Sequence, residues 1–476
     1  VRSCYVRNAP ARPVIDKQFK EERGLVSLCA ALIGDLAPLL PAEAKLLSKA
    51  HAIQRRAIAE ARAQILSGED PLGAAFCALR SPGERRRHGA TYTPAAIVHA
   101  MVAWAKDEIA NPARIVDPGS GSGRFLVAAA RVFREAQLVA VDVDPLATLM
   151  LRANAAVHGF ASRLSVHLCD YRSLEMPAVA GVSLFVGNPP YVRHHEIDRE
   201  WKAWFAATAK RFGVGASKLA GLHIHFFFRT LELAKEGDCG AFITAAEWLD
   251  VNYGAALRRL LGNGLGGTAV HIIEPTAQPF PDALTTGAIT CFRVGARSAA
   301  IRMRSVSSLE DLSRLDRGRA IGWDEIGNAP KWSVFVRGPQ LAQDGFIELG
   351  ELFRVHRGQV TGANELWIDN EAARDVPSRL KLATVTSARE LIEAGDELSC
   401  ANHLRRVIDL PPDLDGLDDG EREAVLQFLA WVKQRGGHRG YSDASPDMVV
   451  GRVARASAGF VHVHGAATPS LRSQQG

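Results

Sequence analysis

The residues best suited to chemistry in this 476-residue sequence are Asn188, Pro189, Pro190 and Tyr191. They follow the apolar run LFVG, which is typical of a buried strand. Proline has no backbone N–H and cannot extend a central strand, so we expect the chain to leave the sheet at Asn188. The side-chain carbonyl of Asn188 and the backbone carbonyl of Pro189 could then accept hydrogen bonds from the two hydrogens of one amino group.

An amino group on an aromatic ring is a poor nucleophile, because its lone pair is delocalised into the ring. Two acceptors aimed at its N–H bonds favour a tetrahedral nitrogen and stabilise the charge that develops as it attacks a sulfonium methyl group. The two prolines would hold these acceptors in place, and Tyr191 could stack on the ring, a contact worth about 1–3 kcal/mol per base. A proline turn with a packed tyrosine is the simpler interpretation, and for a Pro-Pro pair alone it is the common one.

A glycine-rich turn precedes this stretch, in DPGSGSGRFL at residues 117–126. Gly119, Gly121 and Gly123 allow a tight turn and a close approach of a ligand to backbone N–H groups at the start of a helix. Such turns also serve simple packing. The turn alone leaves NAD open as a ligand, but nothing near Asn188 offers the groups needed for hydride transfer, whereas the asparagine–proline motif suits transfer to an amino nitrogen.

Three acids, Asp117, Asp142 and Asp170, follow successive apolar runs. Asp142 comes 23 positions after Gly119, where an acid can accept both hydroxyls of a ribose, and Asp170 could accept an adenine amino hydrogen. Each acid by itself is more often a helix cap. All three at the carboxyl ends of predicted parallel strands, beside a glycine turn, favour a nucleoside cofactor.

The elements that must position these residues are predicted from apolar periodicity. Strand-like and helix-like segments alternate between about residues 90 and 296, which predicts a doubly wound α/β sheet, parallel and covered by helices on both faces. We therefore expect a helical N-terminal segment over 1–88, a catalytic α/β domain over 89–296 and an α+β domain over 297–476. The tail from about residue 445 lacks periodicity, so we expect it to be poorly ordered.

Composition is that of a globular protein, with 47% hydrophobic and 23% charged residues. No apolar window approaches the roughly 20 residues needed to cross a bilayer, and the first residues are too polar for a secretory signal, so we predict a cytoplasmic protein without a membrane partner. The seven cysteines are scattered, which argues against disulfides and against a metal site. The net charge of +5 is too small to indicate nucleic acid by itself.

Together these motifs resemble the gamma-class N6-adenine DNA methyltransferases of bacterial restriction–modification systems. The similarity covers about residues 89–296 and includes TYTP at 91–94, the glycine turn, VDVDP, CDY and GNPPY. The resemblance implies S-adenosyl-L-methionine as the cofactor, double-stranded DNA as the substrate, and a target adenine that is flipped out of the duplex. The cofactor residues that it implies are Tyr92, Thr93, Asp117, Gly119, Ser120, Gly121, Gly123, Asp142, Asp170 and Asn188.

The same resemblance gives roles to segments beyond the catalytic motif. Phe280, in EPTAQPFPDALTTGAITCF, would sandwich the flipped base against Tyr191, although packing in the core explains this phenylalanine equally well. HRGQVTGANELW, at 356–367, is similar to the start of a target-recognition domain, in which Arg405 and Arg406 would meet phosphates. A restriction nuclease, if one accompanies the chain, is expected to be a separate protein.

Three other functions remain open from the residues alone. Asparagine–proline motifs also occur in enzymes that methylate the glutamine of release factors or the bases of RNA. The 180 residues after Ala296 favour DNA, because glutamine methyltransferases lack a long domain there. A DNA-binding protein that keeps a degenerate methyltransferase scaffold is the third possibility, although Asn188 and the glycine turn are intact. The recognition sequence cannot be deduced, and cytosine remains an alternative to adenine.

Overall fold

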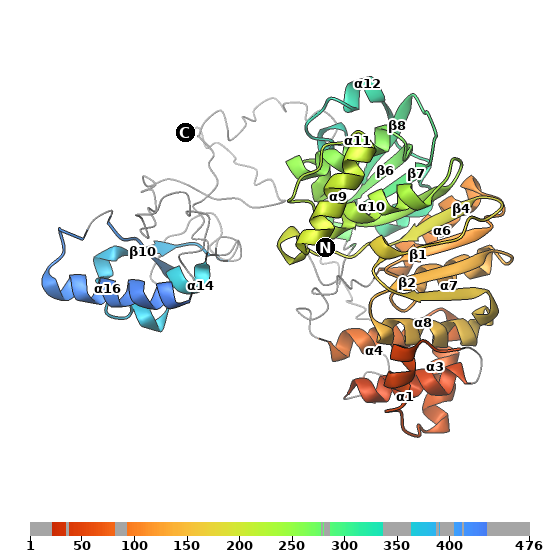
Figure 1. Ribbon diagram of the computed structural model, residues 1–476, viewed down its shortest axis with the longest axis horizontal. Helices are drawn as coiled ribbons and strands as arrows, with labels where there is room; N and C mark the ends of the chain where they lie inside the picture. The colour runs from red at the N-terminus through yellow and green to blue at the C-terminus, as the bar shows by residue number, and fades with distance from the viewer. Residues whose placement is uncertain are drawn as a thin grey trace, which may run out of the picture. The chain divides into compact units, whose positions relative to one another are not determined.

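The computed structural model describes residues 21–34, 38–80, 93–277, 279, 286–336, 363–386, 390, 404–411 and 414–435. The chain divides into two compact units, Val1–Leu341 and Ala342–Gly476, each described by itself (Figure 1). Among the described residues, no helix combines the length and the apolar character that crossing a membrane requires.

A nine-stranded sheet forms the centre of the first unit, in the order β3-β2-β1-β4-β5-β7-β6-β8-β9. The strands are β1 (Arg114–Pro118), β2 (Gln137–Asp142), β3 (Leu164–Leu168), β4 (Ser183–Gly187), β5 (Cys239–Ala245), β6 (Gly267–Ile273), β7 (Gly287–Arg293), β8 (Ala300–Val306) and β9 (Arg319–Gly322). β1 to β5 are parallel, as predicted. The sheet as a whole is mixed, however, because β7 runs antiparallel to β5 and β6. Consecutive neighbours such as β6 and β7 can pair antiparallel without a crossover helix.

Both faces of the sheet are covered, as the unbroken burial of β1 and β4 requires. Ile115 faces a cluster with α6 (Ala95–Glu108) and α7 (Arg124–Val132). The next residue, Val116, faces the opposite cluster. That cluster contains side chains of α9 (Arg199–Arg211), α10 (Leu222–Leu233) and α11 (Ala255–Gly262).

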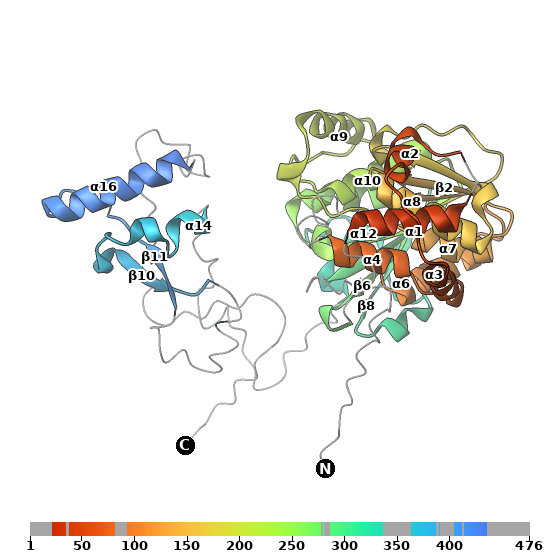
Figure 2. The same ribbon diagram turned by 90° about the horizontal axis from the view of Figure 1, so that it is seen from below.

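Among the described residues before Arg80, four helices confirm the helical N-terminal segment: α1 (Glu22–Ile33), α2 (Pro41–Leu47), α3 (Arg55–Ser67) and α4 (Pro71–Leu79). They pack on α8 (Pro145–His158) through an apolar cluster of their own (Figures 1 and 2). Glu43 of α2 and Arg152 of α8 add a buried ion pair with an Nε–Oε1 distance of 2.8 Å. The segment is therefore fastened to the sheet layer rather than separate from it.

The sheet continues beyond Ala296, where the sequence analysis ended the catalytic domain. β8 pairs in parallel with β6, and β9 follows as the antiparallel edge strand. Alternate burial along β8 is the pattern of a strand near the edge of a sheet, and it is too weak a sequence signal to continue the strand–helix alternation. α12 (Trp323–Ile326) comes directly after β9.

The second unit contains a small core around Trp367, Ile408, Val425 and Phe428. Its elements are α14 (Asn364–Trp367), β10 (Lys381–Thr384), β11 (Arg405–Ile408) and α16 (Asp419–Gln434). β10 and β11 pair antiparallel. The tail after about residue 445 lies outside the described residues.

Candidate functional site

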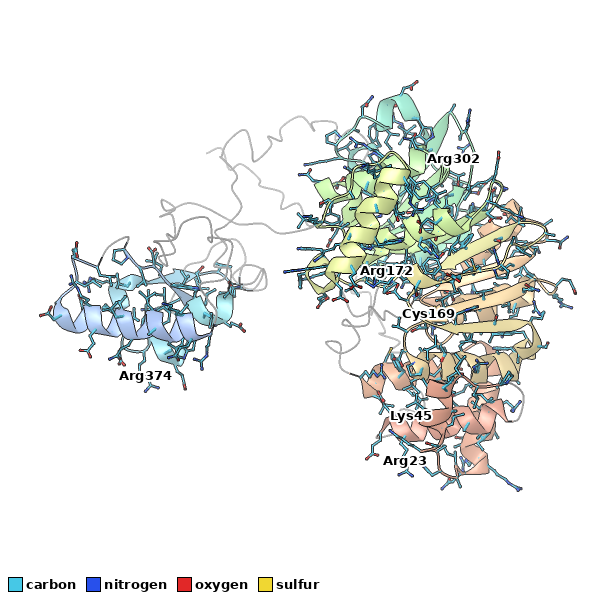
Figure 3. All side chains as sticks on the ribbon, in the orientation of Figure 1. Arg23, Lys45, Cys169, Arg172, Arg302 and Arg374 are labelled. Carbon is cyan, nitrogen blue, oxygen red and sulfur yellow. The ribbon has the colours of Figure 1, made fainter. Side chains whose placement is uncertain are left out.

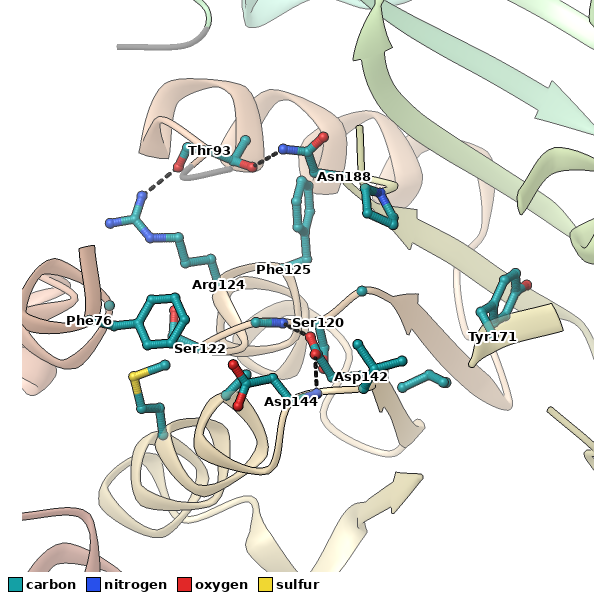
Figure 4. Close-up of a pocket in the computed structure, with 18 of the residues that line it drawn as sticks. Phe76, Thr93, Ser120, Ser122, Arg124, Phe125, Asp142, Asp144, Tyr171 and Asn188 are labelled. Carbon is teal, nitrogen blue, oxygen red and sulfur yellow. Dashed lines mark hydrogen bonds between the residues drawn. The ribbon is translucent and has the colours of Figure 1, made fainter. Parts of the chain in front are cut away.

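A cavity of about 230 Å³ opens at the carboxyl ends of β1, β2, β3 and β4 (Figure 4). This is the edge at which open α/β sheets bind ligands. Residues singled out from the sequence that line the cavity are Thr93, Gly119, Ser120, Gly121, Asp142, Asp170, Asn188 and Pro190. The structure therefore brings together residues from distant motifs, such as Thr93 and Asn188, which are 95 positions apart in the chain.

The glycines of the turn serve different purposes, although all three have positive φ. A Cβ on Gly121, where φ is 53°, would meet no atom within 4 Å, so this position opens onto the cavity. A Cβ on Gly123 would lie 2.0 Å from Cδ1 of Leu151 in α8. Gly123 is consequently required by helix packing and does not line the cavity.

Asp142 lies at the end of β2 with its carboxylate held in a fixed orientation. One oxygen accepts from the Gly121 N–H at 2.8 Å, and the other accepts from the Asp144 N–H at 3.0 Å. Burial raises the pKa of this carboxyl, while the backbone N–H groups act in the opposite direction. Each carboxylate oxygen can accept a further hydrogen bond, so Asp142 can still bind a pair of hydroxyls.

Asp170, after β3, is paired with a residue that the sequence analysis missed. Its carboxylate accepts from the Arg172 backbone N–H, from Nε at 2.9 Å and from Nη2 at 2.6 Å. The Arg172 guanidinium also lies 4.1 Å from the ring centroid of Trp201 in α9 (Arg172 is labelled in Figure 3). Asp170 keeps 29% of its side chain exposed, so it remains open to the cavity.

Asp117 lies beneath the glycine turn and is not part of the cavity wall. Its side chain is fully buried, and neither carboxylate oxygen has a hydrogen-bond partner within the described part of the chain. Burial and, secondarily, the nearby charge of Asp142 raise its pKa well above the usual value. An unpaired buried carboxylate is costly, and such groups are retained where they perform a task.

Replacement of Asp117 by asparagine should therefore stabilise the folded chain at pH 8. Because the native pKa of Asp117 is raised, the unfolded chain loses this proton first, near pH 3.9. Between that pH and the native pKa, the free energy of unfolding falls as pH rises, by about 1.4 kcal/mol per pH unit. Asparagine does not ionise, so the variant avoids this loss of stability. Its stability advantage over the wild-type chain should vanish below about pH 4. Urea unfolding at pH 8 and pH 4 measures it, with the exposed Asp107→Asn as control. An equal or lower free energy of unfolding at pH 8 would contradict the interpretation.

The motif residues Asn188 and Tyr191 contact each other. The Tyr191 hydroxyl donates to Oδ1 of Asn188 at 2.6 Å and lies 3.2 Å from the backbone oxygen of Ile243 in β5. Nδ2 of Asn188 donates to the Thr93 hydroxyl at 3.0 Å. Tyr191 is half-buried against the core and is not in the cavity wall, and burial raises its pKa well above the usual value. Pro189, which precedes it in the motif, is buried.

Several lining residues come from places that sequence motifs did not indicate. Gly73, Phe76 and Cys77 belong to α4 of the N-terminal helices, and Phe226 belongs to α10. The helical periodicity of α4 showed that one face is buried but not what covers it. Tyr92 and Phe280 lie outside the described residues, so the predicted sandwich of a base between Phe280 and Tyr191 stays a prediction.

A mixed α/β sheet with a glycine turn, an acid after its second strand and an asparagine–proline motif around one cavity is typical of α/β enzymes that bind a nucleoside-containing ligand. The Eco57I restriction-modification methylase family matches residues 175–272, which contain the motif. The type II methyltransferase M.XamI of Xanthomonas campestris pv. amaranthicola is 50% identical over 433 residues, 89% of this chain and 80% of the relative. The chain therefore belongs to the type II methyltransferases of restriction–modification systems.

More distant proteins are also similar. The type II methyltransferase M.AccI of Acinetobacter calcoaceticus is 22% identical over 300 residues, 60% of this chain and 54% of that protein. Among solved structures, the type IIG restriction endonuclease BpuSI aligns with a TM-score of 0.47 and 16% identity, over 92% of this chain and 59% of that chain.

Proposed function

We propose that this chain transfers a methyl group from S-adenosylmethionine to the N6 amino group of adenine in double-stranded DNA. The observation that carries the proposal is the contact between the two motifs. Asn188 lines the same cavity as the glycine turn and Asp142, and a Cβ on Gly119 would lie 3.4 Å from Pro190. An acceptor for an amino group is thus adjacent to a site suited to a nucleoside.

The residues around the cavity fit S-adenosylmethionine. Asp142 can accept the ribose hydroxyls, and Val143 and Phe226 provide apolar surface for an adenine ring. The Ser120 hydroxyl lines the cavity and is a buried polar group without a hydrogen-bond partner among the described residues. When bound, the cofactor supplies an electrophilic methyl group on a sulfonium.

Asn188 then acts on the target amino group. Its Oδ1 accepts from the Tyr191 hydroxyl, and a second lone pair on the same oxygen can accept from the amino group. The carbonyl of Pro189 is the second acceptor, and together they stabilise the positive charge that develops on nitrogen. No strong base is needed at this step, because the proton becomes acidic once the methyl group has been transferred.

DNA is favoured as the substrate by the residues after Ala296. The match to the Xanthomonas relative covers 89% of the chain, so it includes most of the 180 residues that follow Ala296. In the second unit, Arg405 and Arg406 of β11 are exposed, as is Arg374, which is labelled in Figure 3. Exposed arginines of this kind suit phosphate contacts, and the unit is our candidate for the target-recognition domain.

The test offers cofactor with a labelled methyl group to unmethylated DNA, to RNA and to a release factor in parallel. We expect label in DNA, and digestion to nucleosides should give N6-methyladenine. Label confined to RNA or protein would contradict the proposal, and N4-methylcytosine would correct the base. The salt dependence of DNA binding, measured in the same buffers, should be steep if phosphate contacts dominate.

Two variants of Tyr191 separate the contribution of its ring to transfer from that of its hydroxyl. Tyr191→Phe keeps the ring and removes the hydrogen bond to Asn188, so transfer should slow by less than about tenfold. Tyr191→Ala removes the ring as well and should cost about a hundredfold in kcat/KM for DNA, because stacking is worth about 1–3 kcal/mol. Steady-state kinetics with a DNA substrate of known site measures both. Equal losses in the two variants would show that the hydroxyl, not stacking, is what Tyr191 contributes.

A further inference from the structure

Asp70, at the start of α4, has more partners than a helix cap needs. Its Oδ1 accepts from the Gly73 N–H at 2.9 Å, which is the capping bond. Its Oδ2 accepts from the Ser122 hydroxyl at 2.5 Å and from Nε of Arg124 at 3.0 Å. Only 8% of the side chain is exposed. One buried carboxylate therefore joins an N-terminal helix to the glycine turn and to the first residue of α7.

The contacts continue from Arg124 to the catalytic motif. Nη1 of Arg124 donates to the backbone carbonyl of Thr93, and the Thr93 hydroxyl accepts from Nδ2 of Asn188 at 3.0 Å (Figure 4). An unbroken series of hydrogen bonds thus runs from Asp70 through Arg124 and Thr93 to Asn188. Nothing in the sequence indicates this series, because its members come from four different segments.

The position of α4 is fixed at both of its ends. Asp70 holds its start to the glycine turn, and Arg80, just after its end, pairs with Asp144 and Glu22. Between these two anchors, Phe76 and Cys77 face the cavity (Figure 4 labels Phe76). Asp144 itself lines the cavity and donates its backbone N–H to Asp142. The two ends of α4 are therefore bonded to the two segments that also bond to Asp142, namely the glycine turn and Asp144.

We infer that the N-terminal helices complete the active site, and that Asp70 is a positioning residue that fixes both the glycine turn and, through Arg124 and Thr93, the amide of Asn188. The inference rests on the proposed function for its activity measurements. The physical reason is charge: Arg124 is largely buried, and a buried guanidinium that loses its carboxylate must reorient toward water. Reorientation would release the Thr93 carbonyl, and a small displacement of a catalytic group is costly to the rate.

The variant that tests this is Asp70→Asn. Asparagine caps a helix as well as aspartate does, so α4 should remain folded while the charge facing Arg124 is lost. We expect transfer at saturating cofactor to slow about tenfold and the Kd for S-adenosylhomocysteine to rise about tenfold. Glu69→Gln, an exposed neighbour, is the matched control and should change neither quantity.

Two further variants separate the effect on S-adenosylhomocysteine binding from the effect on transfer. Ser122→Ala removes only the bond to the glycine turn, and should weaken S-adenosylhomocysteine binding without slowing saturated transfer. Thr93→Val removes the hydroxyl that Asn188 contacts, and should slow saturated transfer by a larger factor than it weakens binding. The double variant Asp70→Asn/Thr93→Val should be no slower than the slower single variant, because both act through one series of contacts. Multiplicative slowing would contradict transmission through Thr93.

A measurement without cofactor keeps this inference separate from the proposed function. In Asp70→Asn, amide hydrogen exchange should accelerate in residues 93–98 and 119–124 while the remaining amides exchange at wild-type rates. If the wild-type chain binds no S-adenosylhomocysteine, the cofactor proposal fails and exchange still decides the role of Asp70. If exchange, binding and rate are all unchanged in Asp70→Asn, the positioning role is wrong.

Discussion

The Asn188→Ala variant should transfer methyl groups about a hundred to a thousand times more slowly than the wild-type chain, which is the usual effect of removing one preorganised group that stabilises transition-state charge. Alanine removes Oδ1, the proposed acceptor for the target amino group, and leaves the backbone carbonyl of Pro189 as the remaining one. Cofactor affinity should change little, because this amide bonds to Thr93 and Tyr191, whereas Asp142 bonds to the backbone of Gly121 and Asp144.

Single-turnover transfer to DNA with saturating cofactor measures the chemical step, and calorimetry with S-adenosylhomocysteine measures affinity. Asn263→Ala is the control, since Asn263 is an exposed asparagine at the end of α11. Asn188→Asp adds a graded case: the carboxylate keeps an acceptor but loses the Nδ2–H donated to Thr93. We expect it to fall between wild type and alanine. A near-normal rate for Asn188→Ala would show that the amide is not the group acting on the nucleophile.

The cofactor end of the site could be predicted because parallel strands share one edge. Because β1, β2 and β3 could be predicted as successive parallel strands, Asp142 and Asp170 were expected near the glycine turn. The same argument brought Asn188, after β4, to the cavity. These predictions depended on local periodicity and on the edge at which the carboxyl ends of parallel strands meet.

Other features depended on contacts that no local pattern encodes. The pairing of β7 between β5 and β6 follows from which apolar run finds which edge, and the runs themselves look alike. The contact of Tyr191 with Ile243 joins residues 52 positions apart. Arg172 occupies both oxygens of Asp170, which the motif CDY did not suggest. In each case tertiary packing selected the partner, which no local sequence pattern encodes.

The packing of the N-terminal helices also depends on contacts that no local sequence pattern encodes. Their apolar faces predicted helices that pack on something, and the structure shows that this is α8, the helix that follows Asp142. Because α8 begins shortly after Asp142, helices that pack on α8 lie near the cavity as well. A segment that the sequence predicted only to be helical thus contributes Phe76 and Cys77 to the wall.

Replacement of Asp142 by alanine should weaken cofactor binding at least a hundredfold and leave the saturated transfer rate within about threefold. Hydrogen bonds to a charged acceptor are worth about 1.5–3 kcal/mol each, and a tenfold change in Kd corresponds to about 1.4 kcal/mol, so losing two ribose contacts suffices. Burial raises the pKa of Asp142. Wild-type affinity should therefore decline on acidification at a higher pH than an ordinary aspartate would give, since the ionised form is the better acceptor.

Asp142 also holds the glycine turn through the Gly121 N–H, so a loss of affinity alone would not prove contact with the ribose. Comparing S-adenosylhomocysteine with its 2′-deoxy analogue separates the two roles. The wild-type chain should bind the deoxy analogue more weakly, because one acceptor position then stays unfilled, and Asp142→Ala should bind both ligands equally. If the variant still preferred the ligand with the 2′-hydroxyl by the wild-type factor, Asp142 would only order the glycine turn, and the ribose would be bound elsewhere. Asp107→Ala, an exposed substitution on α6, controls for the change in net charge.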